Sequence, residues 1–172
     1  MISDIFAGIK ALILANFPDY PTNCILQGNQ NNTVMPQNGK QVIMTAFDNE
    51  TETGLPLYNY DATLEIETFT TLADTMFYID FYGSPAQETA RTFKLILESN
   101  YAKQFFYENN YPCSVHRVYP VKNLTRLFGR EMYLPRFLVK CFLFNNIQFS
   151  TSSLGVSSIT PTVRFAPVQK AE

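Results

Sequence analysis

Apolar residues recur at helical spacing near the start of the chain, and two prolines follow them. The apolar positions on one helical face are Ile5, Phe6, Ile9, Leu12 and Ile13. Ser3 is suited to the N-cap because its hydroxyl can accept a hydrogen bond from a free backbone N–H. Since Pro18 and Pro21 disfavour a longer helix, the spacing predicts a helix that ends near Asn16.

The next part of the chain alternates between polar loops and strand-like segments. Residues 28–40 are polar, contain two glycines and a proline, and predict an exposed loop. Residues 42–47 predict a strand, and the Gly and Pro within residues 48–60 predict a second loop. Residues 61–82 favour an extended chain, but their hydrophobic alternation changes phase near residues 72–74. We therefore expect a turn or bulge there, and two paired strands of about 30 Å each that project as an arm.

Helix signals return after Gly83. Ser84, Pro85 and Gln87 have the residue types of an N-cap, a first helical position and a capping box. The buried stripe expected for this helix is Ala86, Ala90, Phe93 and Leu97. A second helical segment is expected over about residues 99–109.

Two further strands are predicted in the second half of the chain, over residues 113–121 and 136–149, while residues 124–134 fit no regular pattern. This order favours an α+β fold, in which helices pack on one face of a mainly antiparallel sheet with a long β-hairpin. We expect one domain over residues 1–149 and a partly extended, Ser- and Thr-rich tail over residues 150–172.

The composition limits the functions that this domain can have. The chain has 172 residues, enough for one hydrophobic core, and 46% of them are hydrophobic. Charged residues make up only 16%, so much of the surface is either neutral and polar or covered by other subunits. The net charge of −2 provides no overall basic field that would attract nucleic acid.

The cysteines and the N-terminus favour a soluble protein made in a cytoplasm. Cys24, Cys113 and Cys141 are odd in number and lack the spacing of a zinc site, so we expect reduced thiols. The first residues lack the pattern of a signal peptide. No apolar run reaches the roughly 20 residues that span a bilayer.

Few residues combine into a candidate catalytic or metal site. The single histidine, His116, lies in a predicted strand and is best interpreted as structural. Ser84 is better explained as a helix cap than as a nucleophile, because no GxSxG motif surrounds it. Glu65, Glu67 and Asp80 could form a carboxylate site, but the two glutamates share one strand face, as solvated charges do. We predict no enzymatic activity, no catalytic residue, no cofactor and no metal site.

Charge is distributed unevenly along the chain. Residues 48–80 contain eight acidic residues and no Lys or Arg, whereas residues 117–140 contain six basic residues and one acidic residue. Either these segments neutralise each other within one subunit, or the acidic segment of one subunit meets the basic segment of the next. For the second interpretation, the candidate interface residues are Glu65, Glu67, Asp74, Arg117, Lys122, Arg126 and Arg130.

The order of these segments resembles a known family. IDFYG at residues 79–83, followed by the predicted helix SPAQETA at residues 84–90, is similar to the "DFYG..A...A" signature of neck and tail terminator proteins of tailed bacteriophages. Val118, NLT at residues 123–125 and YLPR at residues 133–136 resemble the later part of that pattern. The resemblance covers about residues 42–149. The family tends to have a tryptophan or an acidic residue before the Pro-Arg pair, and this chain does not.

This resemblance implies a structural virion protein. Such subunits form a homo-oligomeric ring, typically a hexamer, at the head-proximal end of the tail, where the ring stops tube polymerisation and joins the tail to the head. The implied partners are further copies of the chain, the tail tube protein and a head-completion or connector protein. DNA would pass through the lumen without specific binding, no membrane would be involved, and assembly would take place in the host cytoplasm.

Three further expectations and two alternatives accompany this assignment. We expect the acidic segment to lie near the lumen or an intersubunit seam, the lumen to be acidic or neutral, and the loop at residues 28–40 to order on docking. The first alternative is another head–tail connector or tail-completion protein. The second is a cytosolic ligand-binding or enzymatic domain, with a pocket under the second helix near His116 or Cys141.

Overall fold

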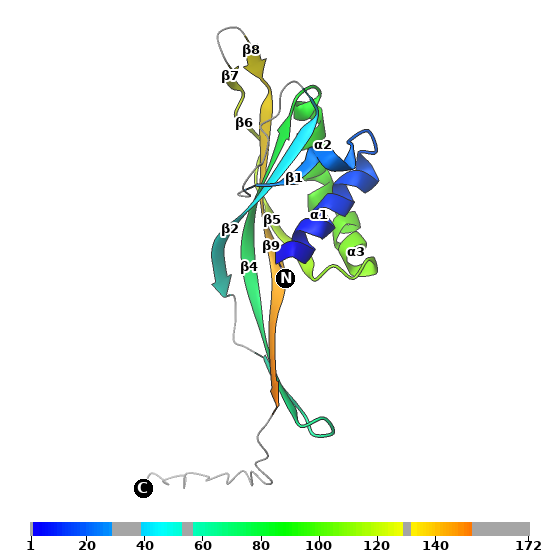
Figure 1. Cartoon of the computed structure of the whole chain (residues 1–172), viewed down its shortest axis with the longest axis vertical. Helices are drawn as coiled ribbons and strands as arrows, with labels where there is room; N and C mark the ends of the chain where they lie inside the picture. Colours follow the sequence, from blue (N-terminus) through cyan, green and yellow to red (C-terminus); the bar gives the residue numbers. More distant parts are fainter. Residues whose placement is uncertain (1, 29–38, 53–56, 129–131, 153–172) are drawn as a thin grey trace, which may run out of the picture.

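Two long antiparallel strands run through the structure, a computed structural model that describes residues 2–28, 39–52, 57–128 and 132–152. Strands β4 (Ile66–Tyr82) and β9 (Arg136–Ser152) pair along their whole length, with Ile66 opposite Ser152 and Tyr82 opposite Arg136. Figure 1 shows this pair along the long axis, with the helices packed on one side of the sheet.

The other elements assemble around this pair. The helices are α1 (Ile2–Asn16), the short 3-10 helix η1 (Thr22–Cys24), α2 (Ala86–Glu98) and α3 (Asn100–Glu108). The other strands are β1 (Ile25–Gln27), β2 (Gln41–Glu52), β3 (Leu57–Asp61), β5 (Cys113–Val118), β6 (Lys122–Asn123), β7 (Arg126–Phe128) and β8 (Met132–Leu134). The main sheet has the order β1-β2-β4-β9-β5, and among the described pairs only β1–β2 is parallel. The predicted α+β fold, with helices on one face of a mainly antiparallel sheet, is confirmed.

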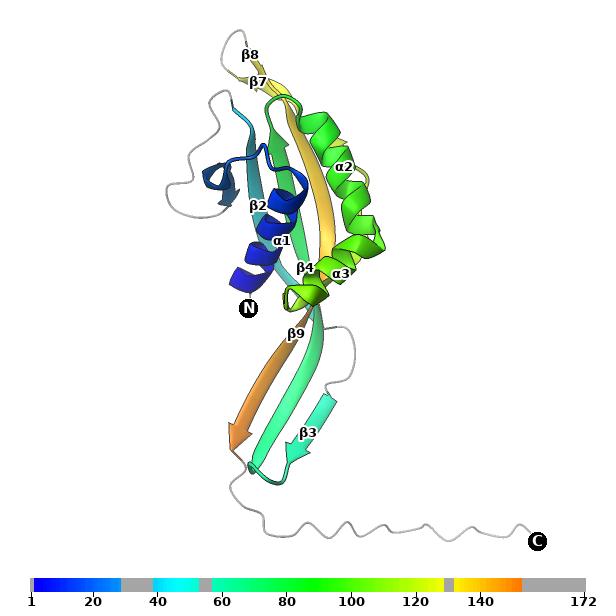
Figure 2. The same cartoon turned by 90° about the vertical axis from the view of Figure 1, so that its right-hand side faces the viewer.

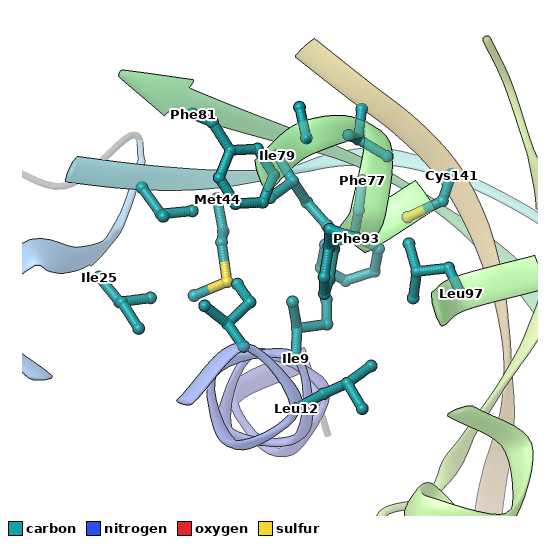
Figure 3. Packing of buried hydrophobic residues seen from close by; sticks show 14 of the residues in the cluster. Ile9, Leu12, Ile25, Met44, Phe77, Ile79, Phe81, Phe93, Leu97 and Cys141 are labelled. Atoms are coloured by element: carbon teal, nitrogen blue, oxygen red, sulfur yellow. The ribbon is translucent and has the colours of Figure 1, made fainter. Parts of the chain in front are cut away.

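The hydrophobic core fills the space between the helices and the facing side of the sheet. Phe77, Ile79 and Phe81 alternate along β4 and are fully buried, as strand geometry requires when one face is covered. Phe6 of α1 packs edge-on against Phe77, with ring centroids 5.4 Å apart, and Phe93 of α2 lies 5.5 Å from Phe81. Figure 3 shows Phe77, Phe81 and Phe93 close together on the side of the sheet that faces helix α1, from which Ile9 and Leu12 point toward them.

The helix predictions hold because each helix has one apolar face. The first helix ends at Asn16 as predicted, where the side-chain amide donates to the Leu12 carbonyl oxygen. Helices α2 and α3 fall within a residue or two of their predicted bounds. The stripe predicted for α2 is buried: Ala86, Ala90, Phe93 and Leu97.

Both N-cap predictions are wrong. Ser3 lies inside α1, and the N-cap residue of α2 is Pro85 rather than Ser84, without a side-chain cap. The chain turns into α2 at Gly83, where φ is +84° and a Cβ atom would lie 2.6 Å from the Gly39 carbonyl oxygen. The turn therefore depends on glycine geometry rather than on a capping box.

A projecting arm is present, but its strands differ from the predicted ones. A hairpin turn at residues 72–74 is wrong, because β4 runs through it, but the register with β2 is irregular beside this point, between Phe47 and Thr51 of β2. The hairpin turn lies at residues 62–65 instead. The Asp61 carboxylate accepts hydrogen bonds from the backbone of Thr63 and Leu64 in this turn. The arm therefore consists of β3 and the outer halves of β4 and β9, and it extends beyond the helices (Figure 2).

Several predicted loop and strand bounds also change. The bounds of the loop predicted over residues 48–60 are wrong, since β2 continues to Glu52 and β3 begins at Leu57; residues 53–56 lie outside the described residues. Strand β5 ends at Val118 rather than at residue 121, and β9 continues three residues past its predicted end at residue 149. Most of the loop predicted at residues 28–40, and most of the predicted tail, lie outside the described residues.

Burial of two cysteines in and beside the core predicts slow thiol chemistry. Burial raises the pKa of Cys141 to about 12, and of Cys113 to about 12, above the usual value of about 8.5. At pH 8 their thiolate fraction, and so their alkylation by iodoacetamide, should be about a thousandfold lower in the folded chain than after unfolding. Raising the pH to 9 should accelerate the folded reaction about tenfold. Mass spectrometry of labelled peptides measures the rates, and equal rates before and after unfolding would contradict the burial.

Candidate assembly surface

The face of the main sheet that points away from the helices carries most of the charged residues of β4 and β9, together with several aromatic rings. Even-numbered residues of β4 and β9 point to this side, because the odd-numbered ones face the core. Among the described residues no helix covers this side, as Figure 1 shows. We call it the uncovered face and define it by these residues and their neighbours on β2 and β5.

One ion pair fixes the end of this face next to α2. Arg136 donates two hydrogen bonds to Asp80, from Nε to Oδ1 at 2.8 Å and from a terminal nitrogen to Oδ2 at 3.0 Å. The hydrogen bond to Asp80 raises the pKa of Arg136, and the guanidinium lies 5.7 Å from the Tyr82 ring centroid. Asp80 is therefore neutralised locally and forms no carboxylate site with the distant Glu65 and Glu67.

A β-bulge places the histidine on the same face. Val115 pairs with Leu143 and Arg117 with Phe142, so His116 is the extra residue. Its Nδ1 is hydrogen-bonded to Oδ2 of Asp74 at 2.8 Å, and its ring stacks on Phe144 with centroids 4.1 Å apart. These contacts agree with the structural interpretation of His116.

Arg117 follows the bulge and lies near the same carboxylate. Its pKa is raised first by a hydrogen bond to the Tyr119 hydroxyl, and the charge of Asp74 adds to the effect. The structure thus brings together two of the candidate interface residues, Asp74 and Arg117, within one subunit.

A lysine surrounded by aromatic rings lies at the centre of the uncovered face. The Nζ atom of Lys140 is 5.0 Å from the Tyr119 centroid, 5.4 Å from Phe142 and 5.7 Å from Tyr78. These distances permit cation–π attraction. Among the described residues, these rings lie around the Lys140 ammonium group, and no carboxylate forms an ion pair with it.

The remaining candidate interface residues are far apart within the subunit. Glu67 is opposite Thr151 on β9, whereas Arg117 is opposite Phe142, nine residues further along the same strand. At about 3.4 Å per residue this separation is about 30 Å. Within the subunit, Asp80 is therefore paired with Arg136 and Asp74 lies beside His116, whereas Glu67 of the arm cannot reach Arg117.

The other basic candidates lie still further from the arm. Lys122 is opposite Leu138 and is exposed. Arg126 belongs to β7, where only the backbone is described, and Arg130 lies outside the described residues.

Sequence reasoning missed Lys140 and its aromatic neighbours as members of the candidate site. The signal was available in β9, where residues 137–144 read FLVKCFLF and place apolar side chains on both faces. Strands with this pattern are buried on both sides. The described helices cover only one side of this sheet. Such a strand therefore indicates that a second layer covers the other side.

The described residues offer little for ligand or metal chemistry. They contain no group of three or more His, Cys, Asp or Glu residues that could hold a metal, and no helix long and apolar enough to cross a membrane. An open cavity of about 580 Å³ lies beside the start of α2, lined by Pro85, Leu95, Pro135 and Phe137 among others. Neither His116 nor Cys141 lines it, contrary to what the ligand-binding alternative expected.

One polar residue of β9 lies within the core rather than in a ligand site. Asn145 is buried on the helix side of the strand, where its Oδ1 accepts a hydrogen bond from the Thr75 hydroxyl at 3.0 Å. A hydrogen-bonded buried amide of this kind stabilises the core.

The described chain is thus an elongated α+β subunit with a projecting arm and an uncovered face that carries charged and aromatic side chains. The sequence profile of the phage neck terminator protein family matches residues 2–167, so the chain belongs to that family. No curated protein matches the chain. The family is structural, and it places the chain among the head–tail proteins of a bacteriophage virion, in association with other tail and head components.

The Asp80–Arg136 pair should be important for stability. Replacing Arg136 by Leu leaves the Asp80 carboxylate buried without its cation, and we expect a loss of about 2 kcal/mol in the free energy of unfolding. The loss of stability should be smaller than for a fully buried ion pair, because the Arg136 side chain is 27% exposed. Urea unfolding measures the loss. The double variant Asp80→Asn with Arg136→Leu should recover at least half of it, and equal stability of the two variants would count against this assignment.

Proposed function

We propose that the chain forms a ring, typically a hexamer, at the head-proximal end of the phage tail. The ring stops polymerisation of the tail tube and joins the tail to the head. Its partners are further copies of the chain, the tail tube protein and a head-completion or connector protein, and it assembles in the host cytoplasm. Family membership supports this proposal.

The arm is the observation that carries the proposed ring. It extends beyond the helices of its own subunit, so these helices leave its faces open to another molecule (Figure 2). A contact between the arm of one copy and the body of the next joins two different surfaces. Repeated head to tail, such a heterologous contact closes into a ring when the rotation between copies permits.

Charge supports the same arrangement of neighbours. Residues 57–72 contain Asp61, Glu65 and Glu67 and no Lys or Arg. In the proposed seam these arm residues face the basic end of the next copy, which contributes Arg117, Lys122, Arg126 and Arg130. Asp74 remains on its own subunit beside His116.

Termination follows from a ring with two different rims. One rim matches the last ring of the tube, and the other lacks a surface to which more tube protein can add, so growth ends. The second rim instead binds the head-completion protein. DNA passes through a lumen that is neutral or acidic, because inward-pointing Lys or Arg side chains would bind phosphate.

The function is tested by polymerising the tail tube protein with and without the purified chain. We expect shorter tubes, each with one terminal ring in electron micrographs. Unchanged tube lengths would exclude termination. Rings that bind isolated heads but never tubes would support the connector alternative instead.

The proposed seam predicts a salt-sensitive ring. The double reversal Arg117→Glu with Lys122→Glu should raise the protein concentration for half-assembly about tenfold, because it removes attraction to the acidic arm. Raising the salt concentration should have a similar effect on the unchanged chain. Light scattering across protein concentration measures both.

A matched control reverses two exposed charges on the helices, Arg91→Glu with Lys103→Glu. It makes the same change in net charge, and assembly should stay within about twofold of the unchanged chain. Equal weakening by the two double variants would show that net charge, rather than the seam, controls assembly.

A further inference from the structure

The two faces of the arm differ in chemistry. On one face Thr68 and Ser150 share a hydrogen bond between their hydroxyls at 3.2 Å, and Asn59 pairs with Thr68. On the other face the rings of Tyr58 and Phe69 contact each other, with centroids 5.2 Å apart. The arm thus has a polar face and an aromatic face, and the aromatic face consists of Tyr58, Tyr60, Glu67 and Phe69.

The aromatic face belongs to the helix side of the sheet but lies where no described helix reaches. Odd-numbered β4 residues face the core, and the unbroken β4–β9 register keeps Phe69 on that side in the arm. The exposed fractions are 57% for Tyr58, 46% for Tyr60 and 40% for Phe69. A thin sheet with exposed rings gains stability when another surface covers them. This face is therefore an interaction surface.

The acidic residue on the aromatic face indicates the chemistry of the surface that covers it. Glu67 lies among the rings, since it is opposite Tyr60 and next to the Tyr58–Phe69 pair; after desolvation, its negative charge adds to the rise in the pKa of Tyr58. The partner therefore needs apolar rings to cover the aromatic face and a cation to meet Glu67. The uncovered face of this same chain offers both, since Lys140 lies among Tyr78, Tyr119 and Phe142.

We propose that the aromatic face of the arm packs on the uncovered face of a second copy, with Glu67 of one copy paired to Lys140 of the next. The inference rests on the proposed ring and names its subunit contact. It produces two stacked sheets, with the arm of one copy as the missing outer layer of its neighbour. The two surfaces differ, so the contact repeats head to tail.

The pair cannot form within one subunit. Glu67 is opposite Thr151 and Lys140 is opposite Tyr78, so the two positions lie eleven residues apart along β9. That separation is about 35 Å, and the two side chains also point to opposite sides of the sheet. A Glu67–Lys140 contact can therefore form only between two copies of the chain.

Zero-length crosslinking tests the contact directly. A mixture of 14N- and 15N-labelled full-length chains is concentrated until it assembles and is treated with a carbodiimide, which joins carboxylates to touching amines. We expect Glu67–Lys140 peptides that carry one label from each copy. Assembled rings without such peptides would overturn the contact.

A charge exchange provides the second test. Glu67→Lys and Lys140→Glu should each raise the concentration for half-assembly about tenfold, and the combined variant should return it to within about threefold of the unchanged chain. The matched controls lie on the helices, outside the proposed seam: Glu88→Lys on α2 and Lys103→Glu on α3, both exposed. Pairing Glu67→Lys with Lys103→Glu, or Glu88→Lys with Lys140→Glu, should not restore assembly to this extent. Equal rescue by all pairs would overturn the specific contact in favour of a diffuse charge effect.

These outcomes are distinguishable from a failure of the proposed function. If the chain shortens tubes but remains monomeric at every concentration, the proposed termination is supported and the proposed contact between copies is wrong. If rings form without the Glu67–Lys140 crosslink, the ring stands and this contact fails. If rings carry the crosslink but leave tube length unchanged, the contact stands and termination fails.

Discussion

The register between β4 and β9 is the constraint on which the rest of the structure depends. In the body it places Phe77 against the helices and Lys140 on the uncovered face. In the arm the same register keeps Phe69 on the helix side, although no described helix lies there. Because side chains alternate with a period of two, a slip by one residue would move the core residues to the uncovered face and the charges into the core. Folding of the body therefore also determines which face of the arm is aromatic.

Helices were predictable from the sequence because each buries one stripe, whereas the long strands were not. The hydrophobic alternation that ends in Phe77, Ile79 and Phe81 arises because the helices cover one face of β4 there. Ile66 lies in the arm, where both faces are open, so alternation there carries no information about a core. The change of phase marks the point where β4 leaves the helices rather than a turn. Gly83 was likewise misinterpreted, because its role depends on the distant Gly39.

The candidate site was predictable in its charges but not in its pairings. Asp80 and Arg136 are 56 residues apart in sequence, and only the sheet register brings them together. His116 reaches Asp74 through a bulge, which single-sequence alternation does not reveal. Family resemblance named the class of protein correctly. It identified neither the uncovered face nor the arm's aromatic face, because both are defined by pairing across strands.

Internal pairing also determines which kind of association the charges favour. Asp80 is paired with Arg136 and Asp74 is hydrogen-bonded to His116, whereas the acidic residues of the described arm are Asp61, Glu65 and Glu67. A two-fold contact between two arms would bring these carboxylates together and leave Lys140 without a carboxylate. A head-to-tail contact instead meets acid with base and covers both aromatic surfaces. For the proposed ring, repulsion in the symmetric dimer therefore acts together with attraction in the seam, and both favour the head-to-tail geometry from which a ring can close.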